Sequence, residues 1–235
     1  MHHHHSLDSA KQQLSDSVDS CSHMIDTALV NLYEENQVKD FITTIKNHSG
    51  HIKYLVNSAG FFKPVSFLEH TASDYDMQME INRAFFFITQ AVAKNMQDHR
   101  GGSIVNIGSM WAHQAVKATP SSAYSMQKAG LHSLTQHLAM ELAEYGIRVN
   151  AVAPAVVLST IYKSFIEKDK IAETLSSFNT FHPLGRIGCC EDIANAVEFL
   201  LSDKADWITG EILNVDGGVE GVRLDRVTIN IKSSF

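Results

Sequence analysis

The chain has 235 residues, a length that suits one α/β domain with one hydrophobic core. Its 26 acidic and 19 basic residues give a formal net charge of −7 without a dense block of Lys and Arg, which excludes nucleic-acid binding as the main role. No apolar run approaches the roughly 18 residues of a membrane span, so we expect no membrane partner.

The cysteines and the chain ends set the expected location and domain limits. Cys21, Cys189 and Cys190 cannot form a disulfide framework, which favours a reducing, cytoplasmic location. The four histidines after Met1 are typical of a purification tag, so residues 1–6 are excluded from the expected fold. We expect a single domain over residues 7–222 and a C-terminal extension over residues 223–235.

The first third of the chain predicts alternating helices and strands. Sparse apolar positions in residues 7–20 indicate an exposed helix, and the sequence TALVNL at 27–32 predicts a strand. Apolar side chains at helical spacing predict a helix over 35–46, and a second strand is expected at 52–56. That strand ends in the small polar run 57–60, at the edge where open α/β sheets bind ligands.

A long helix is expected over residues 73–97, with apolar side chains nearly all round. Such a helix must bury more than one face, which favours packing against a second subunit and hence a homo-oligomer. Asn82 lies in the middle of this helix, and a buried Asn needs hydrogen-bond partners. Either a structural or a catalytic role could supply them.

The chemistry-bearing stretch is a buried strand at 104–107, a polar loop and a helix over 122–145. Ser109 follows the strand, and Tyr124 and Lys128 lie one helical turn apart, with Cβ atoms roughly 6 Å from each other. A neighbouring ammonium favours the phenolate, so this pair could act as a general acid–base. The plainer interpretation is a chance pair on a helix and a turn serine.

The remaining chain completes the alternation. Strands are expected at 147–152 and 211–215, with a helix over 191–201 between them. The irregular, aromatic-rich connection 156–189 could be a substrate lid or a surface loop packed by its own side chains. The alternation predicts an α/β fold with a doubly wound parallel sheet. Cys189 and Cys190 have no His or Cys partners at zinc spacing, so no metal is expected.

Five motifs resemble the short-chain dehydrogenase/reductase family, of the 3-oxoacyl-ACP reductase and sugar dehydrogenase kind. Their order and spacing match that family from about Leu7 to Val222: NSAG at 57–60, NIGS at 106–109, YSMQK at 124–128, RVNAVAP at 148–154 and WITGEILNVDGG at 207–218. The resemblance implies a Rossmann-like fold, an NAD or NADP cofactor, a small alcohol or ketone substrate and a homotetramer.

The resemblance also implies roles for individual residues. Tyr124 is the expected general acid–base, Lys128 lowers its pKa and binds the nicotinamide ribose, and Ser109 hydrogen-bonds the substrate oxygen. Asn82 is expected to support a water relay toward Lys128. The expected cofactor contacts are Asn31, Leu32, Asn57, Ala59, Gly60, Tyr124, Lys128, Pro154, Val157, Ser159 and Thr160.

One departure from the family is large. The family opens with a strand, a glycine-rich turn, a helix and a second strand, and no stretch of this sequence matches them. The turn binds the pyrophosphate and the second strand chooses between NAD and NADP, so that choice is not readable. Loss of two interior strands would leave rows of unpaired backbone groups. Either the printed chain omits residues of the working protein, or it is a truncated product that repacks.

Two functions follow as alternatives. The intact set of Ser109, Tyr124, Lys128 and Asn82 favours an NAD(P)(H)-dependent oxidoreductase that interconverts a secondary alcohol and a ketone. The lack of the glycine-rich turn favours a non-catalytic relative that acts as a subunit or binding module. The substrate itself is not readable from the sequence.

Overall fold

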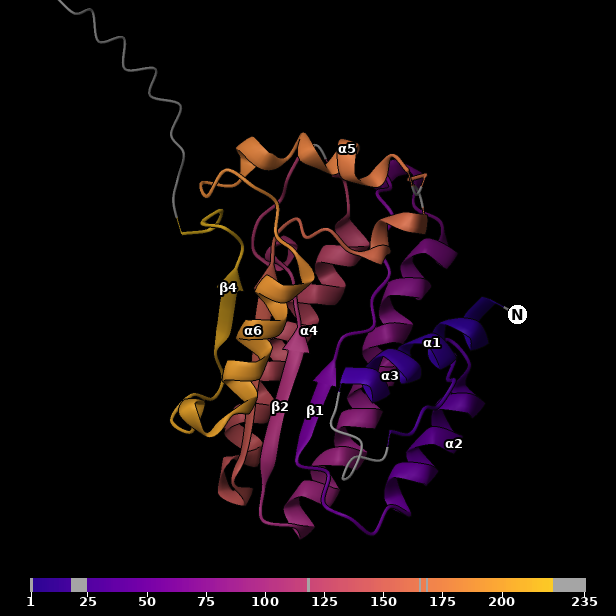
Figure 1. Cartoon of the computed structure of the whole chain (residues 1–235), viewed down its shortest axis with the longest axis vertical. Coiled ribbons are helices and arrows are strands. Elements are labelled where there is room, and N and C mark those ends of the chain that lie inside the picture. The colour runs from indigo at the N-terminus through magenta and orange to yellow at the C-terminus, as the bar shows by residue number, and fades with distance from the viewer. Residues whose placement is uncertain (1, 18–24, 118, 165, 168, 222–235) are drawn as a thin grey trace, which may run out of the picture.

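The computed structural model describes residues 2–17, 25–117, 119–164, 166–167 and 169–221. Its sheet has four parallel strands in the order β1-β2-β3-β4. These strands are β1 Tyr54–Asn57, β2 Gly102–Ile107, β3 Ile147–Pro154 and β4 Ile212–Val215 (Figure 1). The strands lie in the sheet in the same order as in the sequence. Each connection is therefore a crossover that places the next strand beside the previous one and parallel to it. This is the parallel sheet that the alternating pattern predicts.

Helices cover both faces of this sheet. The helices are α1 His2–Ser17, α2 Glu35–Lys46, α3 Ala72–Asp98, α4 Ser122–Leu142, α5 Ile171–Ser176 and α6 Cys190–Leu201. Ile104 of β2 packs in one hydrophobic cluster with α2, α3 and α4, whereas its neighbour Val105 packs against α6 in another. Since successive side chains of a strand point to opposite faces, the fold is doubly wound as expected.

The predicted strand at 27–32 is wrong. The segment is without regular structure up to a turn at Leu32, and Leu29 is 47% exposed. Val30 and Leu32 pack against the hydrophobic cores, but the backbone has no neighbouring strand to pair with in the described part of the chain. β1 is accordingly an edge strand, and its Tyr54 and Val56 side chains are about two-fifths exposed (44% and 39%).

The other predicted elements form, with shifted ends. α1 begins within the tag residues and ends at Ser17, so residues 18–20 of that prediction lie outside the described residues, as does the extension 223–235. α3 begins with a capping box in which Thr71 and Asp74 hydrogen-bond each other's backbone N–H. Its buried stripe packs on the sheet and α4, while Phe86 and Phe87 remain about half exposed.

A buried chain of hydrogen bonds ties the sheet to its two longest helices. Asn57 and Asn106 stand opposite each other in the β1–β2 register, and Asn57 Nδ2 donates to Asn106 Oδ1 at 2.8 Å. Asn57 Nδ2 also donates to Thr89 Oγ1 on α3 at 2.9 Å. Asn106 Nδ2 donates to Thr135 Oγ1 on α4 at 2.9 Å. These four side chains, which we call the amide–hydroxyl chain, are at most 5% exposed.

Replacement of Asn106 by Leu should lower the free energy of unfolding by about 2–4 kcal/mol, because it removes two buried hydrogen bonds, one from the Asn57 amide and one to the Thr135 hydroxyl, at a place that water does not reach. Urea unfolding followed by circular dichroism measures this. Asn36→Leu, on the exposed side of α2, is the matched control and should change stability by less than about 0.5 kcal/mol. Equal effects of the two substitutions would contradict a structural role for the amide–hydroxyl chain.

Candidate functional site

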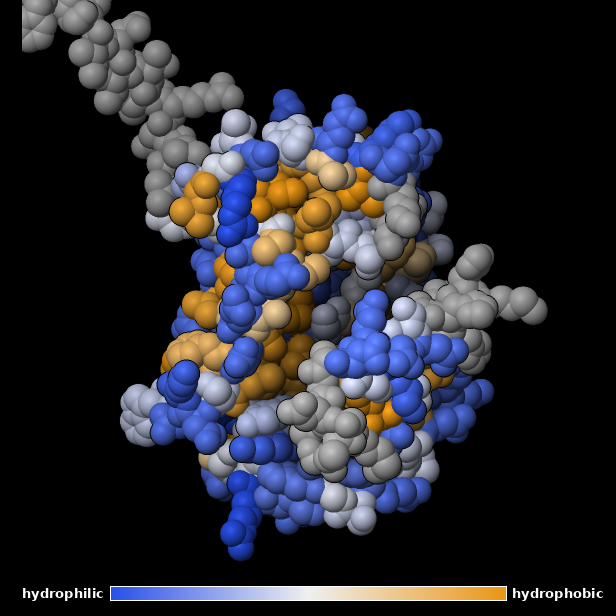
Figure 2. All heavy atoms as spheres, in the orientation of Figure 1, coloured by the Kyte–Doolittle hydropathy of each residue, from blue (hydrophilic) through white to orange (hydrophobic). Residues whose placement is uncertain are grey.

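A cavity of about 600 Å³ opens at the carboxyl ends of β1, β2 and β3. Parallel sheets bind ligands at this edge. On the face seen in Figure 2, apolar side chains line a hollow beside α6. The cavity lining combines a polar set from the motifs with apolar side chains from the sheet and α6, namely Ser109, Tyr124 and Lys128 with Val56, Ile107, Ile193 and Val197.

Ser109 is held at the end of β2 by its own backbone and side chain. The residue is 3% exposed, and its Oγ accepts a hydrogen bond from the Trp111 N–H at 3.3 Å, which caps the short helical turn 110–112. The preceding residue, Gly108, donates its N–H to Val152 O of β3 at 2.8 Å. The Ser109 hydroxyl proton is therefore available for a group in the cavity.

Tyr124 lies in the first turn of α4 and faces the cavity. Its ring packs edge-on against Phe62, with centroids 5.0 Å apart. Burial raises the pKa of Tyr124 above its usual value, and a hydrogen bond with Ser109 opposes this increase only in part. The expectation that Lys128 lowers this pKa remains a prediction; without a ligand, desolvation of the phenolate is the larger effect.

Lys128 is 4% exposed and points back at the sheet. Its Nζ donates to Ile107 O at 2.7 Å and lies 5.6 Å from the centre of the Tyr124 ring. Burial lowers the pKa of Lys128 to about 8, because few groups replace the water that an ammonium loses. The lysine is thus positioned to present a poorly solvated positive charge beside the phenol.

The predicted cofactor residues separate into two groups. Seven of them line the cavity, namely Gly60, Tyr124, Lys128, Pro154, Val157, Ser159 and Thr160. The other four, Asn31, Leu32, Asn57 and Ala59, are not among the lining residues. Asn57 belongs to the amide–hydroxyl chain, and Asn31 caps the turn before α2 by accepting the Tyr33 N–H. Their cofactor roles remain predictions.

Asn82 is bound to α4 rather than to the cavity. Its Nδ2 donates to Gln127 O and its Oδ1 accepts from Gln127 Nε2, both at 2.7 Å. Gln127 directly precedes Lys128, so Asn82 contacts the helical turn that carries the lysine. The water relay expected of Asn82 remains a prediction.

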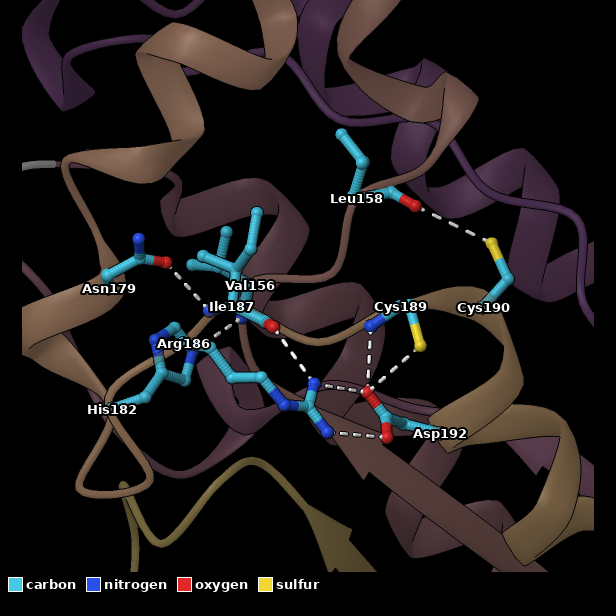
Figure 3. A network of polar contacts seen from close by, with 9 residues as sticks. All are labelled: Val156, Leu158, Asn179, His182, Arg186, Ile187, Cys189, Cys190 and Asp192. Carbon is cyan, nitrogen blue, oxygen red and sulfur yellow. Dashed lines mark hydrogen bonds and ion pairs between the residues drawn. The ribbon is translucent and has the colours of Figure 1, made fainter.

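Hydrogen bonds join the two ends of the aromatic-rich connection 156–189. Val157 and Gly188 form a parallel bridge, with Gly188 N–H donating to Val156 O and Leu158 N–H to Gly188 O, both at 2.9 Å. The Arg186 guanidinium donates to both carboxylate oxygens of Asp192 on α6, at 2.7 and 2.9 Å (Figure 3). The same carboxylate also accepts the Cys189 N–H. These contacts fix the ends of the connection 156–189, and so Val157 and Ser159 lie at a defined place in the cavity wall.

Several cavity residues were not predicted. Phe62 and Trp111 line the cavity, as does Tyr162 from the connection 156–189, and His132 on α4, 4% exposed, accepts the Ser109 N–H. His132 follows Tyr124 and Lys128 at the same four-residue spacing, a signal that the sequence contains. Burial, then the charges of His113 and Lys128, lower the pKa of His132 to about 4, so its imidazole is neutral at physiological pH.

The described residues contain no cluster of three or more His, Cys, Asp or Glu side chains suited to a metal ion. Nor do they include a helix both long and apolar enough to cross a bilayer. Both Cys189 and Cys190 are free thiols, and Cys190 donates a weak hydrogen bond to Leu158 O.

Known proteins identify the family. The family described as Enoyl-(Acyl carrier protein) reductase matches residues 4–220. The chain belongs to the short-chain dehydrogenase/reductase family. A "3-oxoacyl-[acyl-carrier-protein] reductase FabG" of Thermotoga maritima is 33% identical over 197 residues, which cover 83% of this chain and 77% of the relative. A "Carbonyl reductase family member 4" of Xenopus laevis is 39% identical, with coverage of 80% and 75%.

Solved structures agree with this assignment. A gluconate 5-dehydrogenase of Burkholderia cenocepacia, in complex with NADP and tartrate, superposes with a TM-score of 0.77 at 26% identity, covering 92% of this chain and 81% of the other. A putative gluconate 5-dehydrogenase of Beutenbergia cavernae with bound NADP gives a TM-score of 0.80 at 25% identity, with coverage of 91% and 82%.

The cavity suits one half of the family's nicotinamide cofactor. Lys128, Tyr124 and the Pro154–Thr160 segment provide the charge, the hydroxyl and the apolar wall that a nicotinamide and its ribose need. The rest of the lining contains no glycine-rich turn at a helix N-terminus, the arrangement that binds a pyrophosphate. The described residues therefore fit the nicotinamide half of such a cofactor and offer little to the other half.

Replacement of Lys128 by Met should make the unliganded protein more stable at pH 7, by about 1–3 kcal/mol, while removing the charge of the site. The pKa of Lys128 is lowered to about 8, so at pH 7 the folded state holds a charged ammonium that the unfolded state solvates better. Between pH 8 and 10.5 Lys128 is protonated in the unfolded state but not in the folded state, so the free energy of unfolding of the unsubstituted protein rises with pH. The difference in stability between it and the Lys128→Met variant therefore becomes smaller.

Thermal unfolding of both chains from pH 7 to 10 measures this gap. Lys39→Met is the control, because Lys39 is exposed and ion-paired with Glu35 on the surface of α2. A Lys128→Met variant that is less stable than the parent at pH 7, or a gap that does not change with pH, would refute the buried-ammonium explanation.

Proposed function

We propose that this protein is an NAD(P)(H)-dependent oxidoreductase that interconverts a secondary alcohol and a ketone at Ser109, Tyr124 and Lys128. The observation that supports this most strongly is the convergence of these three groups on one cavity, with Tyr124 bonded to Ser109 and Lys128 5.6 Å from its ring. Similarity to reductases and dehydrogenases of this family supports the same reaction class.

The residues divide the work as follows. A bound nicotinamide cofactor supplies or accepts the hydride. In reduction, the Ser109 hydroxyl donates a hydrogen bond to the substrate carbonyl oxygen, and Tyr124 Oη gives its proton to that oxygen as the carbon gains the hydride. In oxidation, Tyr124 accepts the proton of the alcohol. The Lys128 ammonium stabilises the phenolate that remains after proton donation.

The electrostatics favour reduction near neutral pH. Because burial raises the pKa of Tyr124, the unliganded site holds a protonated phenol, which is the form that donates a proton. Oxidation requires the phenolate, so its rate should rise with pH while Lys128 remains charged. The residues of the lid beside the cavity, Ser159 to Tyr162, would contact the substrate and select it.

A second candidate function follows from a specific observation. The exposed edge of β1 and the absence of a pyrophosphate nest among the lining residues favour a non-catalytic subunit or binding module. Such a protein would retain Tyr124 and Lys128 without turnover. The Tyr124 experiment below separates the two candidates, since only the oxidoreductase has activity to lose.

The proposal includes assembly into a homotetramer in the cytoplasm. Phe86 and Phe87 on α3 and Met140 on α4 are 42–68% exposed, and a groove lies between these helices. Apolar side chains at such density suit contact between copies of the chain. Light scattering that gives the mass of a monomer at micromolar concentration would count against the tetramer.

Replacement of Tyr124 by Phe should lower kcat at least about 100-fold, the usual loss for removal of a general acid, because the ring packing on Phe62 remains and only the hydroxyl is lost. Initial rates of reduction with a panel of ketones and both NADH and NADPH measure this. Tyr75→Phe, on the exposed side of α3, is the control and should keep full activity. A Tyr124→Phe variant that keeps more than a tenth of the parent activity would remove Tyr124 from the mechanism.

A chain that consists of residues 1–235 alone should bind NAD or NADP weakly. Backbone hydrogen bonds to a pyrophosphate contribute about 1.5–3 kcal/mol each, and loss of two or three weakens binding by roughly a thousandfold or more. Calorimetric titration of a chain whose mass is 26.0 kDa measures both affinities. A dissociation constant in the low micromolar range would show that the described fold contains a phosphate site after all.

A further inference from the structure

Behind Ser109, three side chains outside the proposed reaction form a continuous line to the surface. Ser109 N–H donates to His132 Nε2 at 3.3 Å, and His132 Nδ1 lies 3.0 Å from His113 Nε2. His113 Nδ1 lies 3.2 Å from Glu220 Oε2, in the segment that follows β4. Gly108 permits this approach, since a Cβ there would lie 2.0 Å from His132 Nε2.

The hydrogen-bond directions in this line leave one arrangement of protons. A backbone N–H can only donate, so His132 Nε2 is the acceptor and its proton is on Nδ1. That N–H then donates to His113 Nε2, which places the proton of His113 on Nδ1, where it donates to the Glu220 carboxylate. Burial, with the charges of His113 and Lys128, lowers the pKa of His132 to about 4, which is consistent with a neutral ring.

We propose that Glu220, His113 and His132 form a tautomer-locked relay that positions Ser109, and that a proton on His113 breaks it. As an imidazolium, His113 presents N–H groups on both sides, and its Nε2–H meets the Nδ1–H of His132. If His132 moves its proton to Nε2, that N–H faces the Ser109 N–H. In either case one hydrogen bond of the line is lost, and the Ser109 loop loses a fixed point.

His113 is the entry point for this proton. Its side chain is 45% exposed, whereas those of Glu220 and His132 are largely buried. The titratable groups around the pair are Glu220, from the segment after β4, and Lys128, four residues before His132 on α4. The relay is intact while His113 is neutral and broken once His113 takes up a proton, a change that imidazole side chains undergo as pH falls. The Glu220 carboxyl lies beside His113, and the charge of Lys128 opposes a positive charge on His132.

The catalytic meaning of the relay rests on the proposed function, but the relay has a readout that needs neither cofactor nor substrate. The chain has two tryptophans, and Trp111 lies in the loop between Ser109 and His113, 8% exposed. The other, Trp207, is 97% exposed, so Trp207→Phe leaves Trp111 as the single reporter of this loop. We expect its emission to change, with the slope of a single-proton titration, as pH is lowered from about 7.5 to 5.

Variants in this background test each link. His113→Gln keeps a donor and an acceptor but cannot take up a proton, so the transition should disappear and the emission should stay at its pH 7.5 value. Glu220→Gln should move the transition to lower pH, since it removes the charge that favours the imidazolium. His132→Leu leaves His113 in place and cuts the line, so no transition should remain. His132→Gln, which restores an acceptor for Ser109 N–H, covers the case in which the Leu variant does not fold.

The outcomes decide the proposal. A transition that persists unchanged in His113→Gln, or in His132→Leu, would overturn the relay, and so would a parent without any transition. For an active enzyme, kcat of the parent should fall about tenfold between pH 7.5 and 5.5 and that of His113→Gln should not, since loss of positioning lowers turnover. A fluorescence transition in a chain without turnover would uphold the relay and refute the oxidoreductase instead.

Discussion

The amide–hydroxyl chain of Thr89, Asn57, Asn106 and Thr135 is the constraint on which the site depends. It joins α3, β1, β2 and α4 at the carboxyl ends of both strands. A buried amide without partners is expensive, so this set is satisfied only when strands and helices take one relative position. The loops that begin at Ser58 and Gly108 therefore start from fixed points. Apolar packing alone would hold the layers together without specifying that register so strictly.

The second constraint is the exclusion of water from the part of the cavity that contains Ser109 and Lys128. Lys128 and Ser109 are almost fully buried, and the walls contributed by Val56, Ile107 and α6 are apolar. In such surroundings an ammonium and a phenol interact more strongly than in water, and each is poorly solvated when charged. Burial raises the pKa of Tyr124 and lowers that of Lys128. Both shifts have the same cause, which is that the charged form of each group loses its hydration. Burial of these two groups therefore lowers the stability of the folded protein at the place where the proposed reaction would occur.

Much of the fold could be predicted from hydrophobic periodicity, because most of its helices and strands bury one face and show it in the spacing of apolar residues. The strand predicted at 27–32 does not form, for a reason that the spacing of apolar residues cannot show. A strand requires a partner, and TALVNL has none in the described part of the chain. Motif spacing indicated Ser109, Tyr124 and Lys128, which line one cavity, because one helix and one strand end fix their positions. The hydrogen bonds of Asn57 to Asn106 and Thr89 could not be predicted, because a sequence does not reveal the register that places Asn57 opposite Asn106; its cofactor role remains a prediction.

Native-state amide hydrogen exchange tests the central claim, that the Ser109 loop is assembled before any ligand binds. In a preassembled loop the amides of Gly108, Ser109 and Trp111 are protected nearly as well as those of Val105 and Asn106 in β2, because Gly108 donates to β3, Ser109 to His132 of α4, and Trp111 to the buried Ser109 hydroxyl. Exchange of these three amides at the rate of an open loop, with β2 still protected, would contradict a preassembled site.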